Sequence, residues 1–458
     1  MEQKQSPKPA APLKTKPAAP AETKPPAPDL PDWMEGGKVN ETAFCRMFEK
    51  KHPMVYYGDS FYGDNGKITD EGLLKDLIYR ELEPYVRTGL SGKVQSLLDA
   101  LRLVTHVLDF PPEEDVVHVT NGMLYFPDWR PKFVLRNFET PVRNRLPVWY
   151  EPEYPQPQPW IDFLHELLEP EDIMTLQEFM GYCLFPTNKA QKMLIIRGRG
   201  GEGKSQVGAV LRSLLGDAAK DGSINKVAEN RFARADLENI HLLIDDDMDL
   251  SALKQTNYIK SLVTASGKVD LEKKGKQSYQ GYMFCRFIGF TNGSLRALYD
   301  RSDGFYRRQL LLTAREKPMN RKDDPDLAKK LLEDKMGILL WCLEGFKRLY
   351  LNNWKFTESH QAKVNLMLSQ AEGNNALPFF RSQGYIRLAP ECAITNKELY
   401  ALYLRWCSDN VAQPMQMRGL LDFLLNHQRD FGVKEDYHCH NAQGLRVRGL
   451  KGIGAAAS

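Results

Sequence analysis

The stretch that most constrains this chain is IIRGRGGEGKS, at residues 195–205. It carries the spacing G-x-x-x-x-G-K-S on Gly198, Gly203, Lys204 and Ser205. The apolar run at residues 193–196 predicts a buried strand, and residues 206–215 are compatible with a helix. Glycines at this spacing let successive backbone N–H groups point at phosphate oxygens, while the lysine reaches the terminal phosphates and the serine hydroxyl binds Mg²⁺. The sequence therefore predicts a phosphate-binding loop at the amino end of a helix.

The ligand expected for such a loop is ATP with Mg²⁺. We expect Lys204 to act in catalysis and Ser205 to hold the metal. The residues expected to surround the nucleotide are Gly198, Arg199, Gly200, Gly201, Glu202, Gly203, Lys204, Ser205 and Gln206.

Composition and residue spacing argue against a disulfide framework, a zinc module and a membrane protein. A length of 458 residues fits two or three domains, and a net charge of +3 does not by itself indicate nucleic-acid binding. The seven cysteines are scattered without a C-x-x-C pair, which favours reduced thiols over a disulfide framework or a zinc module. There is neither a long apolar run nor an apolar signal core near residue 1. We therefore expect a soluble, cytoplasmic protein with no membrane partner.

The chain changes character along its length, which suggests several domains. Residues 193–315 alternate between strand and helix patterns, as an α/β nucleotide-binding domain should. Proline, alanine and lysine dominate the first 30 or so residues, which cannot bury enough apolar surface to become ordered. The predicted parts are a disordered tail at 1–32, a mainly helical domain at 33–165, an ATPase domain at 166–345, a helical connector at 346–384 and a winged-helix-like domain at 385–458.

Two further buried strands in the ATPase region end in polar residues. The stretch IHLLIDDD ends in acids at the edge where an open α/β sheet places its ligands. We predict that Asp245 and Asp246 hold Mg²⁺ and polarise the attacking water, whereas Asp247 is expected to be solvated. The strand at residues 286–292 ends in Asn292, which can orient water against a phosphate; a strand-end cap or turn residue is the alternative, but the two earlier motifs favour the functional interpretation.

Basic residues supply candidates for contacts with nucleic acid and with a transferring phosphoryl group. The segment KVDLEKKGKQSYQ predicts a hairpin whose tip lysines, Lys273, Lys274 and Lys276, contact a phosphate backbone; a solvated charged turn is the alternative. Arg307 and Arg308 are candidates for a catalytic arginine supplied by a neighbouring subunit, with surface ion pairs as the alternative.

The region after residue 385 suggests two helices followed by a basic β-wing. Its arginines available to DNA are Arg418, Arg429, Arg446 and Arg448, and a protein-contacting or purely structural domain is the alternative. The run His438-Cys439-His440 lacks a second ligand pair at a spacing that would suit zinc.

In this order, the motifs GRGGEGKS, HLLIDDD, LEKKGK, FTN and DGFYRR resemble those of the superfamily 3 helicases, which are AAA+-like, and most of all the phage and plasmid primase–helicase group. In that family they are the Walker A loop, the Walker B acids, the DNA-contacting hairpin, the sensor asparagine and the arginine finger. The resemblance extends to a helical domain upstream and a winged helix downstream. Relatives often carry a primase domain where this chain has its Pro-rich tail, so no primer synthesis is expected.

The resemblance implies an ATP hydrolase that works as a ring, usually a hexamer, and moves along single-stranded or forked DNA. It implies replication of a phage, plasmid or other mobile element in a bacterial cytoplasm, with a separate primase or replisome proteins as possible partners. Two alternatives stay open: an origin-binding initiator whose ATPase is an assembly switch, and a packaging or remodelling ATPase.

Overall fold

The computed structural model describes residues 30–127, 131–249, 256–292, 303–317, 324–373, 375–412, 414–440 and 443–456. Nearly all of the tail predicted to be disordered lies outside these ranges. The chain forms two compact units, Met1–His52 with Thr69–His106, and Pro53–Ile68 with Val107–Ser458. The domain bounds read from the sequence, which place a division near residue 165, stay a prediction.

The first unit is built on three helices, α1 (Glu41–Lys51), α2 (Glu71–Leu82) and α3 (Leu90–Val104), with a short pair of strands, β1 (Met34–Glu35) and β2 (Lys38–Val39). Phe44 and Phe48 are one turn apart on α1 and fully buried, so this helix packs on α3 through an aromatic face. Asn40 caps α1 by accepting the N–H of Ala43 at 3.1 Å.

The second unit contains a parallel five-stranded sheet, which confirms the predicted α/β class. Its strands are β9 (Met193–Arg197), β10 (Ala219–Asp221), β11 (Leu242–Asp245), β14 (Arg286–Thr291) and β15 (Gln309–Thr313). They lie in the order β10-β11-β14-β9-β15, with every neighbouring pair parallel. The central strands are continuously apolar because both faces of the sheet are covered.

The strand order places a crevice at one point of the sheet. After β9 the chain moves toward one edge, whereas after β10, β11 and β14 it moves toward the other. Because crossovers between parallel strands are right-handed, connections in opposite directions lie on opposite faces. A ligand crevice therefore opens beyond the carboxyl ends of β9 and its neighbour β14.

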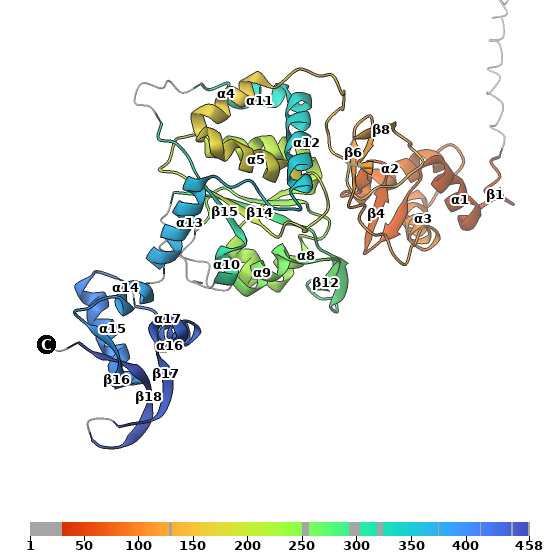
Figure 1. Ribbon diagram of the computed structural model, residues 1–458. Coiled ribbons are helices and arrows are strands. Elements are labelled where there is room, and N and C mark those ends of the chain that lie inside the picture. Colours follow the sequence, from red (N-terminus) through yellow and green to blue (C-terminus); the bar gives the residue numbers. More distant parts are fainter. Residues whose placement is uncertain are drawn as a thin grey trace, which may run out of the picture. The chain divides into compact units, whose positions relative to one another are not determined.

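Alternate residues of β9 enter two separate hydrophobic cores. Leu194 and Ile196 pack with α4 (Gln158–Leu167), α5 (Pro170–Cys183), α6 (Lys204–Leu215) and α12 (Lys335–Leu351). Met193 and Ile195 face α7 (Ile224–Glu229), α8 (Arg231–Ala235), α9 (Thr256–Val263) and α10 (Asp303–Tyr306). The two helix layers lie above and below the sheet in Figure 1.

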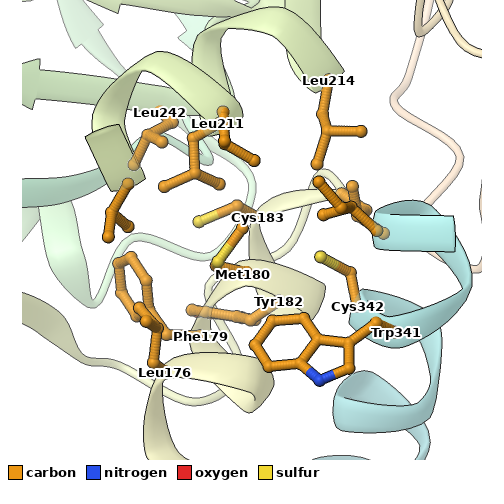
Figure 2. Close-up of a cluster of buried hydrophobic side chains, with 14 of the residues drawn as sticks. Leu176, Phe179, Met180, Tyr182, Cys183, Leu211, Leu214, Leu242, Trp341 and Cys342 are labelled. Atoms are coloured by element: carbon orange, nitrogen blue, oxygen red, sulfur yellow. The ribbon is translucent and has the colours of Figure 1, made fainter. Parts of the chain in front are cut away.

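The first of these cores is closed by a tight crossing of α5 and α12. Figure 2 shows Met180 and Cys183 of α5, Leu211 of α6 and Cys342 of α12 converging in it. A Cβ atom added at Gly181 would lie 2.1 Å from the carbonyl oxygen of Cys342. Only glycine at this position therefore lets the two backbones come so close.

The second unit also contains small antiparallel sheets. Hairpins join β3 (Val55–Tyr57) to β4 (Ser60–Gly63), β6 (Val116–Val119) to β7 (Gly122–Tyr125), and β12 (Lys268–Leu271) to β13 (Tyr279–Tyr282), and the last of these is the predicted lysine hairpin. Each of the first two gains a third strand that the sequence pattern did not indicate, β5 (Gly66–Lys67) and β8 (Lys132–Leu135).

The last part of the chain follows α11 (Leu327–Glu333) and α13 (His360–Gly373). It contains α14 (Ala376–Phe380), β16 (Ile386–Thr395), α15 (Asn396–Asp409), α16 (Met417–Asn426), α17 (Gln428–Phe431), β17 (Lys434–His440) and β18 (Arg446–Ala455). The strands pair antiparallel in the order β16-β18-β17, and a capping box of Thr395 and Glu398 starts α15. The two predicted helices are present, while β16 was not foreseen.

The fold bears on two expectations from the sequence, the one about membrane segments and the one about the cysteines. No helix within the described ranges is both long and apolar enough to cross a membrane. All seven cysteines are free, and six of them are buried, as expected for reduced structural thiols.

Candidate functional site

The predicted phosphate-binding loop joins β9 to the amino end of α6, as its sequence context required. Gly200, Gly201 and Gly203 have φ angles of 112°, 81° and 103°, a backbone region that side chains rarely adopt. The N–H of Gly198 donates to the carbonyl oxygen of Thr291 at 3.0 Å and so ties the start of the loop to β14. The glycines thus allow a tight turn directly over the crevice in the sheet.

A cavity lies at this crevice and collects residues from three strand ends. It is lined by Gly200, Gly201, Glu202, Gly203, Lys204, Ser205, Asp246, Asp247, Phe290, Thr291 and Asn292. The loop follows β9, the acids follow β11, and the asparagine follows β14, which lies between the other two strands. Three motifs that are far apart in the sequence therefore border one cavity.

Lys204 is the centre of this cavity's polar network. Its side chain is only 7% exposed, and its ammonium group donates to Asn292 Oδ1 at 2.9 Å and to Glu202 Oε2 at 2.6 Å. The structure thus brings together two residues that the sequence nominated separately, Lys204 and Asn292. The contact follows from the strand order, since β14 is the direct neighbour of β9.

Glu202 makes contacts that sequence reasoning did not foresee. Its carboxylate, 3% exposed, accepts the backbone N–H groups of Arg199 and of Gly200, the latter at 2.8 Å, besides the ammonium of Lys204. Burial tends to raise the pKa of Glu202, but the hydrogen bonds from Lys204 and from the backbone outweigh burial and lower it to about 2. The available signal was that Glu202 is the one acid inside the loop motif.

The three consecutive acids at the end of β11 differ in their exposure. Asp245 is buried, and its Oδ2 accepts the N–H of Ile224 at 2.8 Å, at the start of α7. Burial raises the pKa of Asp245 above its ordinary value, while the Ile224 N–H opposes this shift. Asp246 and Asp247 are exposed and border the cavity, unlike Asp245. Asp245, which the sequence paired with Asp246, is therefore not among the lining residues, because its carboxylate is buried against the start of α7.

The remaining loop residues are arranged around this network. Ser205 borders the cavity next to Lys204, whereas Gly198, Arg199 and Gln206 are not among the lining residues. The guanidinium of Arg199 lies 2.8 Å from Glu316, and both side chains are largely exposed.

The cavity fits a phosphate with a divalent cation. Two backbone N–H groups and one ammonium already hold an oxyanion, the carboxylate of Glu202, so the donor set suits phosphate oxygens. Ser205, Asp246 and Asp247 add the hard oxygen ligands that Mg²⁺ prefers.

The lysine hairpin forms as predicted, but two of its lysines are engaged within the chain. Lys276 donates to Asp59 at 2.7 Å, and Lys273 donates to the carbonyl oxygen of Gly58 at 3.3 Å, both in the turn between β3 and β4. The hydrogen bond from Lys276 lowers the pKa of Asp59. Lys274 lies exposed at the tip. The contacts of Lys273 and Lys276 were not foreseen, because their partners lie more than 200 residues upstream.

The two candidate arginines lie at the opposite end of the sheet from the cavity. The N–H of Met193 donates to the carbonyl oxygen of Arg308 at 2.8 Å, which places Arg307 and Arg308 at the amino ends of β9 and β15. Five residues of extended strand, about 16 Å, separate that end from the loop. Burial and the neighbouring Arg307 lower the pKa of Arg308. Neither arginine can therefore reach the cavity of its own chain in this arrangement.

The C-terminal candidates are distributed over α16 and the strands after it. Arg418 is 92% exposed on α16, and Arg446 is exposed on β18. Cys439 is buried, while the histidines on either side of it are exposed, because strand side chains alternate. Among the described residues, no group of three or more His, Cys, Asp or Glu could hold a metal ion.

The chain was compared with protein-family models, with curated proteins and with solved structures. A family model, DUF5906, described as a family of unknown function, matches residues 196–308, which is less than half of the chain. No curated protein matches the chain. The A form apo structure of the NrS-1 C-terminal region is similar with 10% identity and a TM-score of 0.47, covering 85% of both chains. An apo structure of NrS-1 C-terminal residues 305–718 has 11% identity and a TM-score of 0.47, covering 89% of this chain and 98% of that one. Because these TM-scores lie below 0.5, the likeness establishes neither a fold nor a function for this chain.

Proposed function

We propose that this chain is an ATP-dependent DNA helicase, related to the superfamily 3 helicases, that serves replication of a phage, plasmid or other mobile element. The observation that carries the proposal is the cavity where the loop donors, Lys204 and Asn292 meet two carboxylates. In this proposal the parallel sheet is a P-loop core of the AAA+ kind, and the C-terminal part is a winged helix.

The residues of the cavity have separate roles in the proposed hydrolysis. Bound ATP would supply the bond to be cleaved, and Mg²⁺ would neutralise its phosphate charge. Lys204 and the N–H groups of the loop would bind phosphate oxygens, and Ser205 would hold the metal. Asp246 and Asp247 would hold the metal and accept the proton of the attacking water, while Asn292 would orient that water. We assign Asp245 a positioning role, because its carboxylate holds the start of α7.

The output of the cycle would be movement along DNA. In a ring, a neighbouring copy can bring Arg307 or Arg308 to the phosphate from outside, which the chain's own arginines cannot do. We propose a homo-hexamer acting on single-stranded and forked DNA in the bacterial cytoplasm, with a separate primase or other replisome proteins as possible partners. Lys274, with Lys273 and Lys276 once they leave the β3–β4 turn, would contact the phosphate backbone.

The decisive test of the nucleotide proposal is Lys204→Ala. We expect Lys204→Ala to abolish ATP hydrolysis, because the ammonium is the cation at the centre of the cavity. Lys220→Ala is the matched control. Lys220 lies on the same sheet but forms an ion pair with Asp236 at the surface, at 3.4 Å, so this variant should hydrolyse ATP at the wild-type rate. Normal turnover by Lys204→Ala would refute the proposal.

Ring assembly can be tested separately. Mass measurement in solution with a non-hydrolysable ATP analogue and single-stranded DNA should show a closed oligomer. A monomer under all conditions would remove the role proposed for the arginines.

A second candidate function is an origin-binding initiator, which the exposed basic residues of α16 and β18 favour. Footprinting on the origin of the element that encodes the chain would show site-specific protection if this were the role. Unwinding of a forked substrate would favour the helicase, whereas movement on blunt duplex without a single-stranded tail would favour a packaging or remodelling ATPase.

A further inference from the structure

One acidic side chain of the loop accepts hydrogen bonds from several donors at once. The carboxylate of Glu202 accepts hydrogen bonds from the N–H groups of Arg199 and Gly200 and from the ammonium of Lys204. The donors all belong to the loop, Gly200 and Lys204 also line the cavity, and all three donate to one anionic group. A loop of this type uses the same kinds of donor, backbone N–H groups and the motif lysine, for phosphate oxygens.

We infer that Glu202 is a built-in substitute for a phosphate group and thereby determines which phosphate ligands the loop accepts. The inference rests on the proposed nucleotide site and adds to it a residue that competes with the ligand. A phosphate can enter only after the carboxylate leaves, since one ammonium and two N–H groups cannot satisfy two anions in the same place.

The loop is built so that this exchange is possible. Glu202 lies between Gly201 and Gly203, both with left-handed φ angles of 81° and 103°. A Cβ atom added at Gly201 would meet nothing within 4 Å, so the backbone before Glu202 has room to rotate. The ionised carboxylate holds its place at neutral pH, because its hydrogen bonds lower its pKa to about 2.

Competition of this kind discriminates between ligands. The apparent affinity for any phosphate equals the intrinsic affinity multiplied by the fraction of molecules in which Glu202 has left the site. Inorganic phosphate gains only the donors that it takes from Glu202, whereas a di- or triphosphate with Mg²⁺ also reaches Ser205, Asp246 and Asp247. The loop should therefore reject single phosphates and accept polyphosphates.

The test is Glu202→Gln, with binding of pyrophosphate and of a non-hydrolysable ATP analogue, each with Mg²⁺, measured by titration calorimetry on the full chain. We expect the dissociation constants to fall by about tenfold or more, because removing the competing anion removes that loss of affinity. Glu316→Gln is the control: it also neutralises one carboxylate near the loop, but this one pairs with Arg199 at the surface. The control should change binding by less than about twofold, as expected of an exposed charge.

A second variant separates competition from a general effect of charge or folding. Glu202→Asp keeps the negative charge but has one methylene fewer, so its carboxylate cannot reach both the backbone donors and Lys204; it should also bind pyrophosphate more tightly. If both variants fold, as judged by circular dichroism, and bind no more tightly than wild type, the inference about Glu202 is overturned. If neither wild type nor variants bind either ligand, the nucleotide site itself is refuted.

Discussion

The pair of Lys204 and Glu202 allows a quantitative test of the site in the absence of any ligand. Both side chains are almost completely buried, at 7% and 3% exposure, and each is the charged partner of the other. Removing Lys204 alone leaves a buried carboxylate without its cation, which is the costly way to break such a pair. Changing Glu202 to glutamine in the same chain removes that charge as well.

The size of the effect follows from the pKa of Glu202. Its lowering from an ordinary 4.5 to about 2 corresponds to about 3 kcal/mol in favour of the ionised, folded form. Because the folded-state pKa lies below the ordinary value, this stabilisation is complete above about pH 4.5 and is lost as the pH falls toward 2. Lys204 provides the largest favourable share, so we expect Lys204→Ala to lower the free energy of unfolding at pH 7 by about 2 to 3 kcal/mol.

The assay is a double-mutant cycle of Lys204→Ala and Glu202→Gln, followed by guanidinium denaturation at pH 7 without nucleotide. We expect the double variant to be more stable than Lys204→Ala alone, with a coupling energy of about 2 kcal/mol. At pH 3 the coupling energy should be smaller, because Glu202 is then protonated in the unfolded state but stays ionised in the folded state. Additive single effects, within about 0.5 kcal/mol, would show that the two side chains are not an energetic unit and would refute the reasoning.

Three further predictions follow from the described contacts. Asp245→Asn should lower the free energy of unfolding by about 1 to 2 kcal/mol, because it weakens the acceptor for the Ile224 N–H, whereas Asp246→Asn should abolish hydrolysis at unchanged stability; loss of hydrolysis in both variants would restore the predicted pair. Asp59→Asn should release the tip of the lysine hairpin and so speed tryptic cleavage after Lys276. An unchanged cleavage rate would show that the hydrogen bond between Lys276 and Asp59 does not hold the hairpin in place. Gly181→Ala should destabilise the fold by about 1 to 3 kcal/mol in thermal melts, because the new methyl group would meet the backbone of α12, while Gly92→Ala, in an open position on α3, should not.

Much of the local structure could be predicted from the sequence, because the patterns involved are short. The strand before the phosphate loop, the helix after it, the lysine hairpin and the helices α15 and α16 all follow from hydrophobic spacing and turn residues. The strands β5, β8 and β16 were missed, since each pairs with a strand that already had a partner in the predicted pattern. Nothing in the isolated segments marks them as strands.

The site was harder to predict than the fold, because its geometry depends on the order of strands. That β14 lies beside β9 decides that Asn292 meets Lys204, and no local pattern encodes this order. The contact between the Asp245 carboxylate and the start of α7, about 20 residues away in the chain, likewise leaves Asp246 and Asp247, and not Asp245, at the cavity. Glu202 occupies an x position of the motif, which is defined by its glycines, lysine and serine, so the motif does not indicate the hydrogen bonds of Glu202.

The position of β9 between β14 and β15 has a consequence for how this chain is synthesised. The ribosome makes β9 before any other strand of its sheet, yet about 90 residues pass before its first neighbour, β14, is complete, and β15 comes later still. At about 5 to 20 residues per second, the apolar segment that carries the phosphate loop waits for several seconds, with both of its edges open. During that interval it can pair with the wrong partner, including β9 of another nascent chain. Slow translation between residues 198 and 285 should therefore increase aggregation, and a chaperone that covers this segment should reduce it.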